Sequence, residues 1–288
     1  MKLFSPRSII QLLSDHGLHP KKSLGQHFLV DYNVLRRIAD ATGVGSEDHV
    51  LEIGSGLGIL TRELASRGAR VVSVEVDKSL LPVLNETLGG LNSVELVLAD
   101  FLKLDLPSFL AERWEGKWIV ASNLPYCITS PIITKLISSK QLFSRIVVTV
   151  QKEVADRLVA PPGSEQYGAL TVFVQYHCEV EQLMTISPRV FFPTPQVESA
   201  LVRLVPREFP AVDVPNDELF FKIVRSAFGK RRKTLLNALA SSREPGWTRE
   251  QVLAILQSAG VDPSRRGETL SITEFAELSK AAAQVLEK

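Results

Sequence analysis

The sequence predicts an α/β fold, a Rossmann-like parallel sheet with helices on both faces, followed by a small all-α C-terminal domain. Between residues 46 and 206, short apolar runs alternate with stretches of helical period, which is typical of a parallel sheet wrapped by helices. Residues 207–288 show only helical patterns. A chain of 288 residues, 45% of them hydrophobic, is long and apolar enough for one large and one smaller core.

Residues 1–45 precede the sheet and are expected to form an N-terminal helical segment and a loop. Apolar side chains at positions 9, 10, 12 and 13 follow a helical period, and a polar joint at 19–29 comes next. A second helix is expected around Val34 to Ala39, with either Asp31 or Asn33 as its N-terminal cap.

The sheet is expected to contain five strands separated by helices. The strands are predicted at residues 50–53, 71–76, 94–99, 118–122 and 146–150, and the helices at 59–67, 79–88, 131–138 and 153–159. Two further β-rich stretches, 169–176 and 199–205, predict an antiparallel, hairpin-like edge that closes the sheet.

The C-terminal domain follows a proline-rich linker at 206–215. Helical patterns cover 217–239, 248–260 and 273–286. Between Leu219 and Arg243 the chain has seven basic residues and no acid, although its net charge is only +1. The run Lys230, Arg231, Arg232 and Lys233 is the candidate contact to RNA phosphates, and a solvated helix face is the alternative explanation.

Composition also bounds the class of protein. The longest apolar stretches are only strand-sized, so no membrane span is predicted. The first residues lack the apolar region of a secretory signal. The two cysteines, Cys127 and Cys178, offer neither a disulfide framework nor zinc-ligand spacing. We therefore expect a cytoplasmic protein without a bound metal.

A glycine-rich turn follows the first predicted strand. Gly54 and Gly56 lie in the sequence Gly-Ser-Gly-Leu-Gly, where open α/β sheets bind ligands, and Glu75 ends the next strand. Glycines let the backbone approach a ligand, and a carboxylate can accept hydrogen bonds from ribose hydroxyls. The spacing G-x-G-x-G differs from the dinucleotide pattern and leans away from NAD. A tight turn beside a solvated acid is the alternative.

Asp100 ends the third predicted strand, and its carboxylate could accept the amino hydrogen of an adenine ring. Capping of a turn would explain this residue as well. Taken with Gly54 and Glu75, three successive strand ends would present a backbone cradle, a ribose acceptor and an adenine acceptor. This set indicates S-adenosyl-L-methionine as the cofactor.

The sequence Asn123-Leu124-Pro125-Tyr126 ends the fourth predicted strand. The amino group of adenine is a weak nucleophile because its lone pair is delocalised into the ring. The Asn123 side-chain oxygen and the Leu124 carbonyl could accept its two hydrogens, Pro125 would rigidify the turn, and Tyr126 would stack on the base. Positioning and electrostatics would then carry methyl transfer. A plain proline turn with a half-buried tyrosine is the alternative.

Phe191 and Phe192 stand before Pro193-Thr194-Pro195 and offer a second aromatic wall. Ordinary core packing of one or both rings would fit the same pattern.

Five motifs occur together along the chain, and as a set they are specific. They are Gly25 to Leu29, Glu52 to Gly58, Asn123 to Tyr126, Phe191 to Ser199 and Phe228 to Lys233. On these residues the chain, from about residue 20 onward, resembles the ribosomal RNA adenine dimethylases, and among them the bacterial small-subunit enzymes.

The resemblance implies more than the spacing does. Such enzymes place two methyl groups on each of two adjacent adenines in the 3'-terminal hairpin of 16S rRNA, within an immature small ribosomal subunit. By similarity, Tyr126 and Phe191 sandwich the adenine, and a loop of the N-terminal segment covers the cofactor. The implied cofactor contacts are His27, Leu29, Gly54, Glu75, Asp100 and Asn123. The family usually has Asn where this chain has His27 and Cys127. We expect a monomer with a role in small-subunit biogenesis.

Three other functions are weighed against this one. A NAD-dependent oxidoreductase could share the sheet, but no suitable catalytic group stands at the fourth strand end. A non-catalytic RNA-binding assembly factor would not need the intact turn from Asn123 to Tyr126. A large-subunit (23S) rRNA adenine methylase of the macrolide-resistance type is disfavoured, on resemblance alone, by Leu124 and the long basic C-terminal region.

Overall fold

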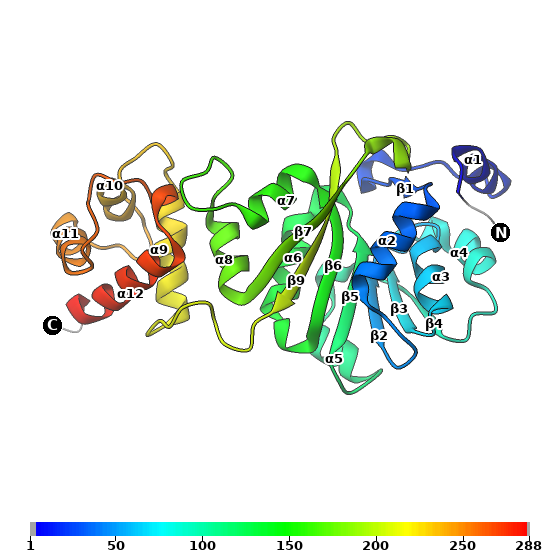
Figure 1. Ribbon diagram of the computed structural model, residues 1–288, viewed down its shortest axis with the longest axis horizontal. Coiled ribbons are helices and arrows are strands. Elements are labelled where there is room, and N and C mark those ends of the chain that lie inside the picture. The colour runs from blue at the N-terminus through cyan, green and yellow to red at the C-terminus, as the bar shows by residue number, and fades with distance from the viewer. Residues whose placement is uncertain (1–3, 287–288) are drawn as a thin grey trace. The chain divides into compact units, whose positions relative to one another are not determined.

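The computed structural model describes residues 4–286 and contains two compact units (Figure 1). The first comprises the chain up to Ala155 together with Val180–Pro206, and the second comprises Asp156–Glu179 together with the chain from Arg207 onward. The N-terminal helices thus belong to the same unit as the sheet, and a segment from the middle of the chain belongs to the C-terminal helical unit.

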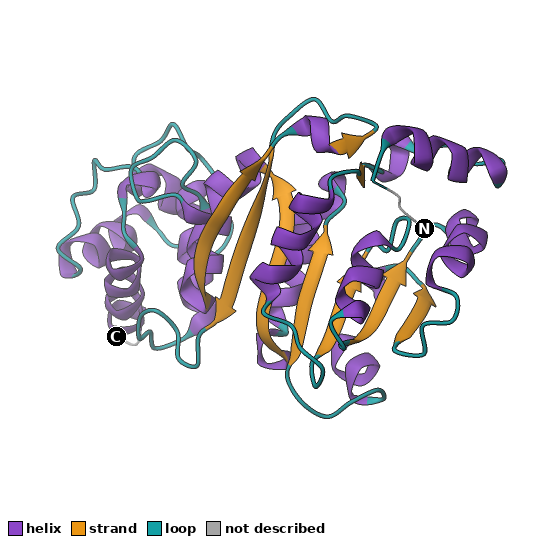
Figure 2. Ribbon diagram, turned by 45° about the vertical axis from the view of Figure 1, so that its right-hand side comes forward, coloured by secondary structure: helices purple, strands orange, loops and turns teal. Residues whose placement is uncertain are grey.

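A seven-stranded sheet forms the centre of the first unit, in the order β4-β3-β2-β5-β6-β9-β7, with helices on both faces (Figure 2). Neighbouring strands from β4 to β6 are parallel, and β9 is antiparallel to β6. The bounds are β2 His49–Ile53, β3 Arg70–Glu75, β4 Val94–Leu98, β5 Trp118–Asn123, β6 Phe143–Gln151, β7 Cys178–Ile186 and β9 Ser199–Pro206. The carboxyl ends of β2 to β5 therefore share one edge, which confirms the predicted fold class.

The expected helices are present in the first unit, before β2 and after β2, β3, β5 and β6, together with a short helix after β4 that the sequence did not predict. They are α1 Pro6–Asp15, α2 Tyr32–Thr42, α3 Ile59–Ser66, α4 Leu81–Leu88, α5 Leu106–Ala111, α6 Thr129–Ser138 and the start of α7 Lys152–Val159. Asp31 is the cap of α2, because its carboxylate accepts from the amides of Asn33 and Val34 at 2.8 and 3.0 Å. A short sheet pairs β1 Phe28–Leu29 with β8 Phe191–Phe192.

The expected strand at residues 169–176 is wrong. This stretch lies in α8, Ala169–His177, and the strand beside β9 at the sheet edge is β7. Val172 and Tyr176 are one helical turn apart and fully buried in the core of the second unit. Packing of this face overrides the β propensity of the valines and Thr171.

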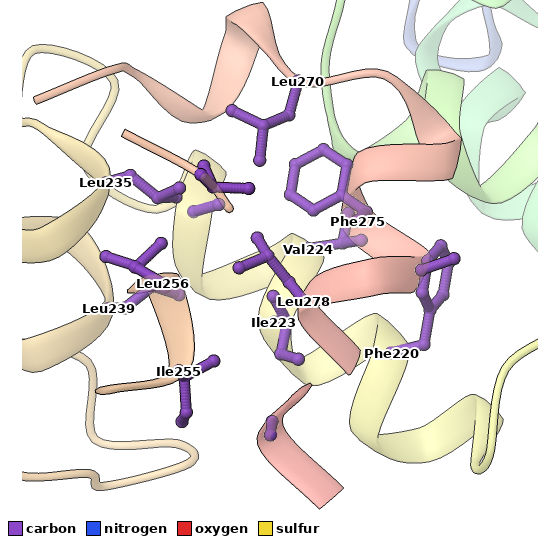
Figure 3. Close-up of a cluster of buried hydrophobic side chains, with 14 of the residues drawn as sticks. Phe220, Ile223, Val224, Leu235, Leu239, Ile255, Leu256, Leu270, Phe275 and Leu278 are labelled. Carbon is purple, nitrogen blue, oxygen red and sulfur yellow. The ribbon is translucent and has the colours of Figure 1, made fainter. Parts of the chain in front are cut away.

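The second unit is a helical bundle around one hydrophobic core. Its remaining helices are α9 Asp217–Phe228, α10 Leu235–Ala240, α11 Arg249–Ser258 and α12 Ile272–Leu286. In Figure 3, Phe220 and Ile223 of α9 face the same core as Leu239, Ile255 and Leu278.

The single helix expected at 217–239 is instead two helices. α9 ends at Phe228, and the hydroxyl of Thr234 caps α10 by accepting from the Asn237 amide. Glycine at position 229 and threonine at 234 are helix-ending and helix-starting residues, and they outweigh the continuous apolar period. The basic run Lys230 to Lys233 therefore lies in a turn.

Within residues 4–286, no helix is long and apolar enough to cross a membrane. No cluster of His, Cys, Asp and Glu suited to a metal ion occurs in that range either.

Candidate active site

A cavity of about 310 Å³ lies at the carboxyl ends of β2 to β5, within the size range of small-molecule sites. Its wall includes ten residues that the sequence predicted, namely His27, Leu29, Gly54, Gly56, Glu75, Asp100, Asn123, Leu124, Pro125 and Tyr126. Phe191 does not line it. The fold thus brings these ten residues together from five separate segments of sequence.

The turn after β2 adopts a backbone that requires glycine. Gly54 and Gly56 have φ values of 82° and 54°, in the left-handed region. A Cβ added at Gly56 would lie 3.3 Å from the Phe28 ring, and one added at Gly54 would approach the Pro125 ring. The turn therefore leaves bare backbone facing the cavity, as a cradle for a ligand requires.

Glu75 ends β3 beside this turn and is 5% exposed. One carboxylate oxygen accepts from the Gly56 amide at 3.0 Å and the other from the Asp77 amide at 2.9 Å. Burial raises the pKa of Glu75, while these hydrogen bonds oppose the rise. A carboxylate offers about four acceptor positions, so the group can still receive ribose hydroxyls.

Asp100 follows β4 and lines the cavity while capping a short 3-10 turn. Its Oδ1 accepts from the Leu102 amide at 3.0 Å, and its Oδ2 lies 3.8 Å from the Lys103 ammonium. Asp100 therefore does cap the turn, and its carboxylate still has acceptor positions for an adenine amine.

Asn123 presents an unpaired acceptor at the end of β5. Its Nδ2 donates to the His27 carbonyl oxygen at 3.1 Å, whereas its buried Oδ1 has no hydrogen-bond partner among the described residues. The next carbonyl, of Leu124, likewise receives no hydrogen bond from the described part of the chain. Pro125 holds the turn with φ −61°. A buried acceptor without a donor costs free energy that a bound amine would recover.

Tyr126 is held at both ends of its side chain. Its hydroxyl hydrogen-bonds with the Ser199 hydroxyl at 2.5 Å, and its ring stacks with His27 at 5.5 Å between centroids. His27 in turn donates from Nδ1 to the Pro193 carbonyl oxygen at 2.6 Å. Cys127, the other departure from the family pattern, is exposed and also lines the cavity.

Phe191 is 2% exposed and packs in the core of the sheet unit with Leu29 and Leu201. Its strand β8 pairs with β1, so that Phe191 lies opposite Leu29. The neighbouring Phe192 is half-buried. The structure thus places Phe191 in the core, as the alternative explanation expected, and the stacking of Phe191 on adenine stays a prediction.

Two more buried acids lie at the cavity, Glu52 in its wall and Asp77 outside it, and the sequence assigned no separate role to Glu52. Glu52 is 1% exposed, and its Oε2 accepts from the hydroxyls of Thr61 at 2.5 Å and Ser73 at 2.7 Å. Burial raises the pKa of Glu52 to about 8. Asp77 is 5% exposed and binds Lys21. An acid inside an apolar strand, as in Val50 to Ile53, was the available signal for Glu52.

The basic run of the second unit is divided in its contacts. Arg231 donates to the carbonyl oxygens of Glu165 and Tyr167 and lies 3.5 Å from the Glu268 carboxylate. Arg232 and Lys233 are exposed and have no acidic partner among the described residues. A nearby hollow of about 400 Å³ has a wall that includes Lys222, Arg225, Lys230 and Arg243, with Glu244 as the acid.

Known proteins are similar to this chain. The ribosomal RNA adenine dimethylase family matches residues 17–283. The chain is 46% identical over 280 residues, 96% of both chains, to a ribosomal RNA small subunit methyltransferase A of Geobacillus thermodenitrificans. A protein of the same name from Bacillus mycoides is 46% identical over 281 residues, again 96% of both chains.

Two solved structures are similar along most of the chain. A dimethyladenosine transferase from Plasmodium falciparum has a TM-score of 0.73 and 27% identity, over 90% of this chain and 98% of that one. The 23S rRNA methyltransferase ErmE has a TM-score of 0.66 and 29% identity, over 89% and 100%. Because the family match spans nearly all of the sequence and residues of three of the five motifs line one cavity, the chain belongs to the ribosomal RNA adenine dimethylase family.

Proposed function

We propose that this rRNA adenine methyltransferase uses S-adenosyl-L-methionine to dimethylate two adjacent adenines in the 3'-terminal hairpin of 16S rRNA. The observation that carries the proposal is the buried, unpaired Asn123 Oδ1 in the wall of the cavity. The small-subunit relatives at 46% identity support this substrate over the 23S alternative. Membership in the family likewise disfavours the oxidoreductase and the non-catalytic alternatives.

The residues present fit the cofactor. The bare backbone of Gly54 and Gly56 can accommodate a close ligand, Glu75 has free acceptor positions for the ribose, and Asp100 has them for the adenine amine. S-adenosyl-L-methionine would supply an electrophilic methyl carbon bound to a sulfonium. All further steps fall to the groups of the protein itself.

The chain's part in the reaction is to orient the target amine. Asn123 Oδ1 and the Leu124 carbonyl accept its two hydrogens, which returns electron density to the nitrogen lone pair. Tyr126 supports the base by stacking. No strong general base is needed, because the methylated nitrogen is acidic and loses its proton readily. Preorganised acceptors and restricted motion therefore provide the catalysis.

The second unit supplies the RNA contacts in this proposal. Lys230, Arg232 and Lys233 are exposed cations, and the adjacent hollow adds Arg225 and Arg243. Such groups bind phosphates without reading sequence. We propose that the substrate is an immature small subunit, and that the protein acts as a monomer in the cytoplasm.

The test is methylation of small subunits that lack these modifications. Purified protein and labelled S-adenosyl-L-methionine are incubated with undermethylated subunits, and the modified nucleotides are mapped. We expect dimethylated N6 positions at two neighbouring adenines near the 3' end of 16S rRNA. Label in 23S rRNA from a parallel incubation with large subunits, and none in 16S rRNA, would overturn the proposal.

A further inference from the structure

Residues 21–29, called the strap below, form the least regular part of the cavity wall. Seven of them, Ser23 to Leu29, line the cavity, yet the segment contains only a 3-10 turn at Lys22–Leu24 and the two-residue strand β1. A segment with so few internal hydrogen bonds depends on contacts at its ends to remain closed.

One end of the strap is held by backbone contacts. Strand β1 pairs with β8, and the Val30 amide donates to the Val190 carbonyl at 2.8 Å. His27 adds its hydrogen bond to Pro193, and its own carbonyl accepts from Asn123. This end is thereby attached to the target-base side of the cavity.

The other end is held by the Asp77 carboxylate and by the Ser79 hydroxyl, which accepts a hydrogen bond from the Lys21 ammonium at 2.7 Å. Asp77 Oδ1 accepts from the Lys21 ammonium at 2.7 Å, and Oδ2 accepts from the Gln26 amide at 2.8 Å. Ser79 donates to Oδ1 from its amide and its hydroxyl, which fixes the rotamer. Burial would raise the pKa of Asp77, but hydrogen bonds from Lys21, Ser79 and Gln26 lower it to about 2, so the group stays charged at neutral pH.

The backbone of the same residue is connected to the proposed ribose acceptor. The Asp77 amide donates to Glu75 at 2.9 Å, and Glu75 accepts from the Gly56 amide at 3.0 Å. A chain of hydrogen bonds thus runs from the glycine turn through Glu75 and Asp77 to the strap. Asp77 itself does not line the cavity, and neither does Lys21.

We infer that Asp77 latches the strap over the cofactor cavity and that this latch sets how long the cofactor remains bound. Asp77 is a positioning residue in this inference, since it acts through Lys21, Gln26 and Glu75. The inference rests on the proposed function only in taking S-adenosyl-L-methionine as the ligand. It assigns the strap a duty separate from the chemistry at Asn123.

The experiment compares wild type with Asp77→Asn and Lys21→Met, and uses Lys22→Met as the matched control. Lys22 is the exposed neighbouring lysine and has no acidic partner among the described residues. Two quantities are measured: hydrogen exchange of the strap amides in cofactor-free protein, and the dissociation rate of S-adenosyl-L-methionine. In both latch variants we expect each to increase about tenfold, which corresponds to about 1.4 kcal/mol, with a smaller change in association. Lys22→Met should match wild type.

Lys21→Met is the decisive variant because its side chain lies outside the cavity wall. Wild-type exchange and dissociation in Lys21→Met would overturn the latch, even if Asp77→Asn failed to fold. Faster dissociation in Asp77→Asn alone, with unchanged exchange, would mean direct contact with the cofactor and would also overturn it. If wild type bound no S-adenosyl-L-methionine, the proposed function would fail, whereas the exchange comparison would still decide whether Asp77 holds the strap.

Discussion

Asn123 donates from its side-chain nitrogen to the backbone carbonyl of His27, 3.1 Å away, and this bond turns its oxygen toward a place where no described group can pair with it. The two residues are far apart in sequence but share the cavity wall. The contact fixes the amide orientation before any substrate arrives, and the unpaired oxygen is the group on which the proposed chemistry depends.

Replacing Asn123 with alanine should therefore impair methyl transfer far more than cofactor binding. We expect the single-turnover rate to fall by about 100-fold or more, as when a preorganised hydrogen-bonding group is removed from an active site. Cofactor affinity should fall by less than about tenfold, because one neutral hydrogen bond to His27 is lost. Asn33→Ala, at an exposed position, serves as the control. A wild-type rate in Asn123→Ala would remove this residue from the mechanism.

Two variants of Tyr126 distinguish the stacking of its ring from the hydrogen bond of its hydroxyl. Tyr126→Phe keeps the ring and loses the hydrogen bond to Ser199, so kcat/KM should change by only a few-fold. Tyr126→Ala also removes the stacking surface, worth about 1–3 kcal/mol, and should lower kcat/KM by about 10- to 100-fold. Steady-state kinetics on undermethylated subunits make the comparison. Equal losses in the two variants would show that the hydroxyl, not the ring, is what matters.

Glu52 predicts a pH dependence of stability. Burial raises its pKa from 4.5 to about 8, so between these values the folded protein holds a proton that the unfolded chain has released. The free energy of unfolding should therefore fall as pH rises through this interval. Glu52→Gln keeps an acceptor for Thr61 and Ser73 but cannot ionise, so it should be stabilised relative to wild type by an amount that grows with pH.

Denaturant unfolding of both proteins at pH 5, 6.5 and 8 tests this difference. Some slope should remain in the variant, because burial also raises the pKa of Glu75. Parallel pH profiles for wild type and Glu52→Gln would contradict the assignment.

The basic turn of the second unit should divide into two classes of residue. Arg232→Ala with Lys233→Ala should leave thermal stability unchanged and reduce the salt dependence of rRNA binding by up to about two units of slope. Arg231→Ala should lower stability as well, because its guanidinium bridges Glu165, Tyr167 and Glu268. Binding isotherms at several salt concentrations and thermal melts distinguish the classes. An unchanged slope in the double variant would place the RNA on another surface.

The parts of the fold set by periodicity were predictable from sequence. The buried strands around Val50 and Val120 and the turn at Gly54 follow from local patterns, and the structure confirms them. The helix at 169–177 was not predictable in this way, because its valines favour strands and only packing in the second unit decides. The helix break before Thr234 could have been inferred from the capping residues, but the continuous apolar period favoured a single helix.

In the site, too, some features follow from local sequence patterns and others depend on tertiary contacts. Strand-end residues such as Glu75, Asp100 and Asn123 were found because the carboxyl ends of parallel strands meet at one edge. The contacts of Asp77 with Lys21 and of His27 with Pro193 join segments that no local pattern connects. Burial of Phe191 likewise depends on the pairing of β1 with β8, and no local sequence pattern predicts this pairing.

The discontinuous composition of the two units limits how this protein can be dissected. Tyr167, Val172 and Tyr176 precede the last strands of the sheet in sequence, yet they are buried in the core of the C-terminal helices. Truncation after Pro206 would remove the helices that bury these three side chains and would leave an exposed, aggregation-prone apolar surface on the remaining fragment. A stable catalytic half would need the whole of 156–179 replaced by a polar bridge, and not merely a stop codon in the linker.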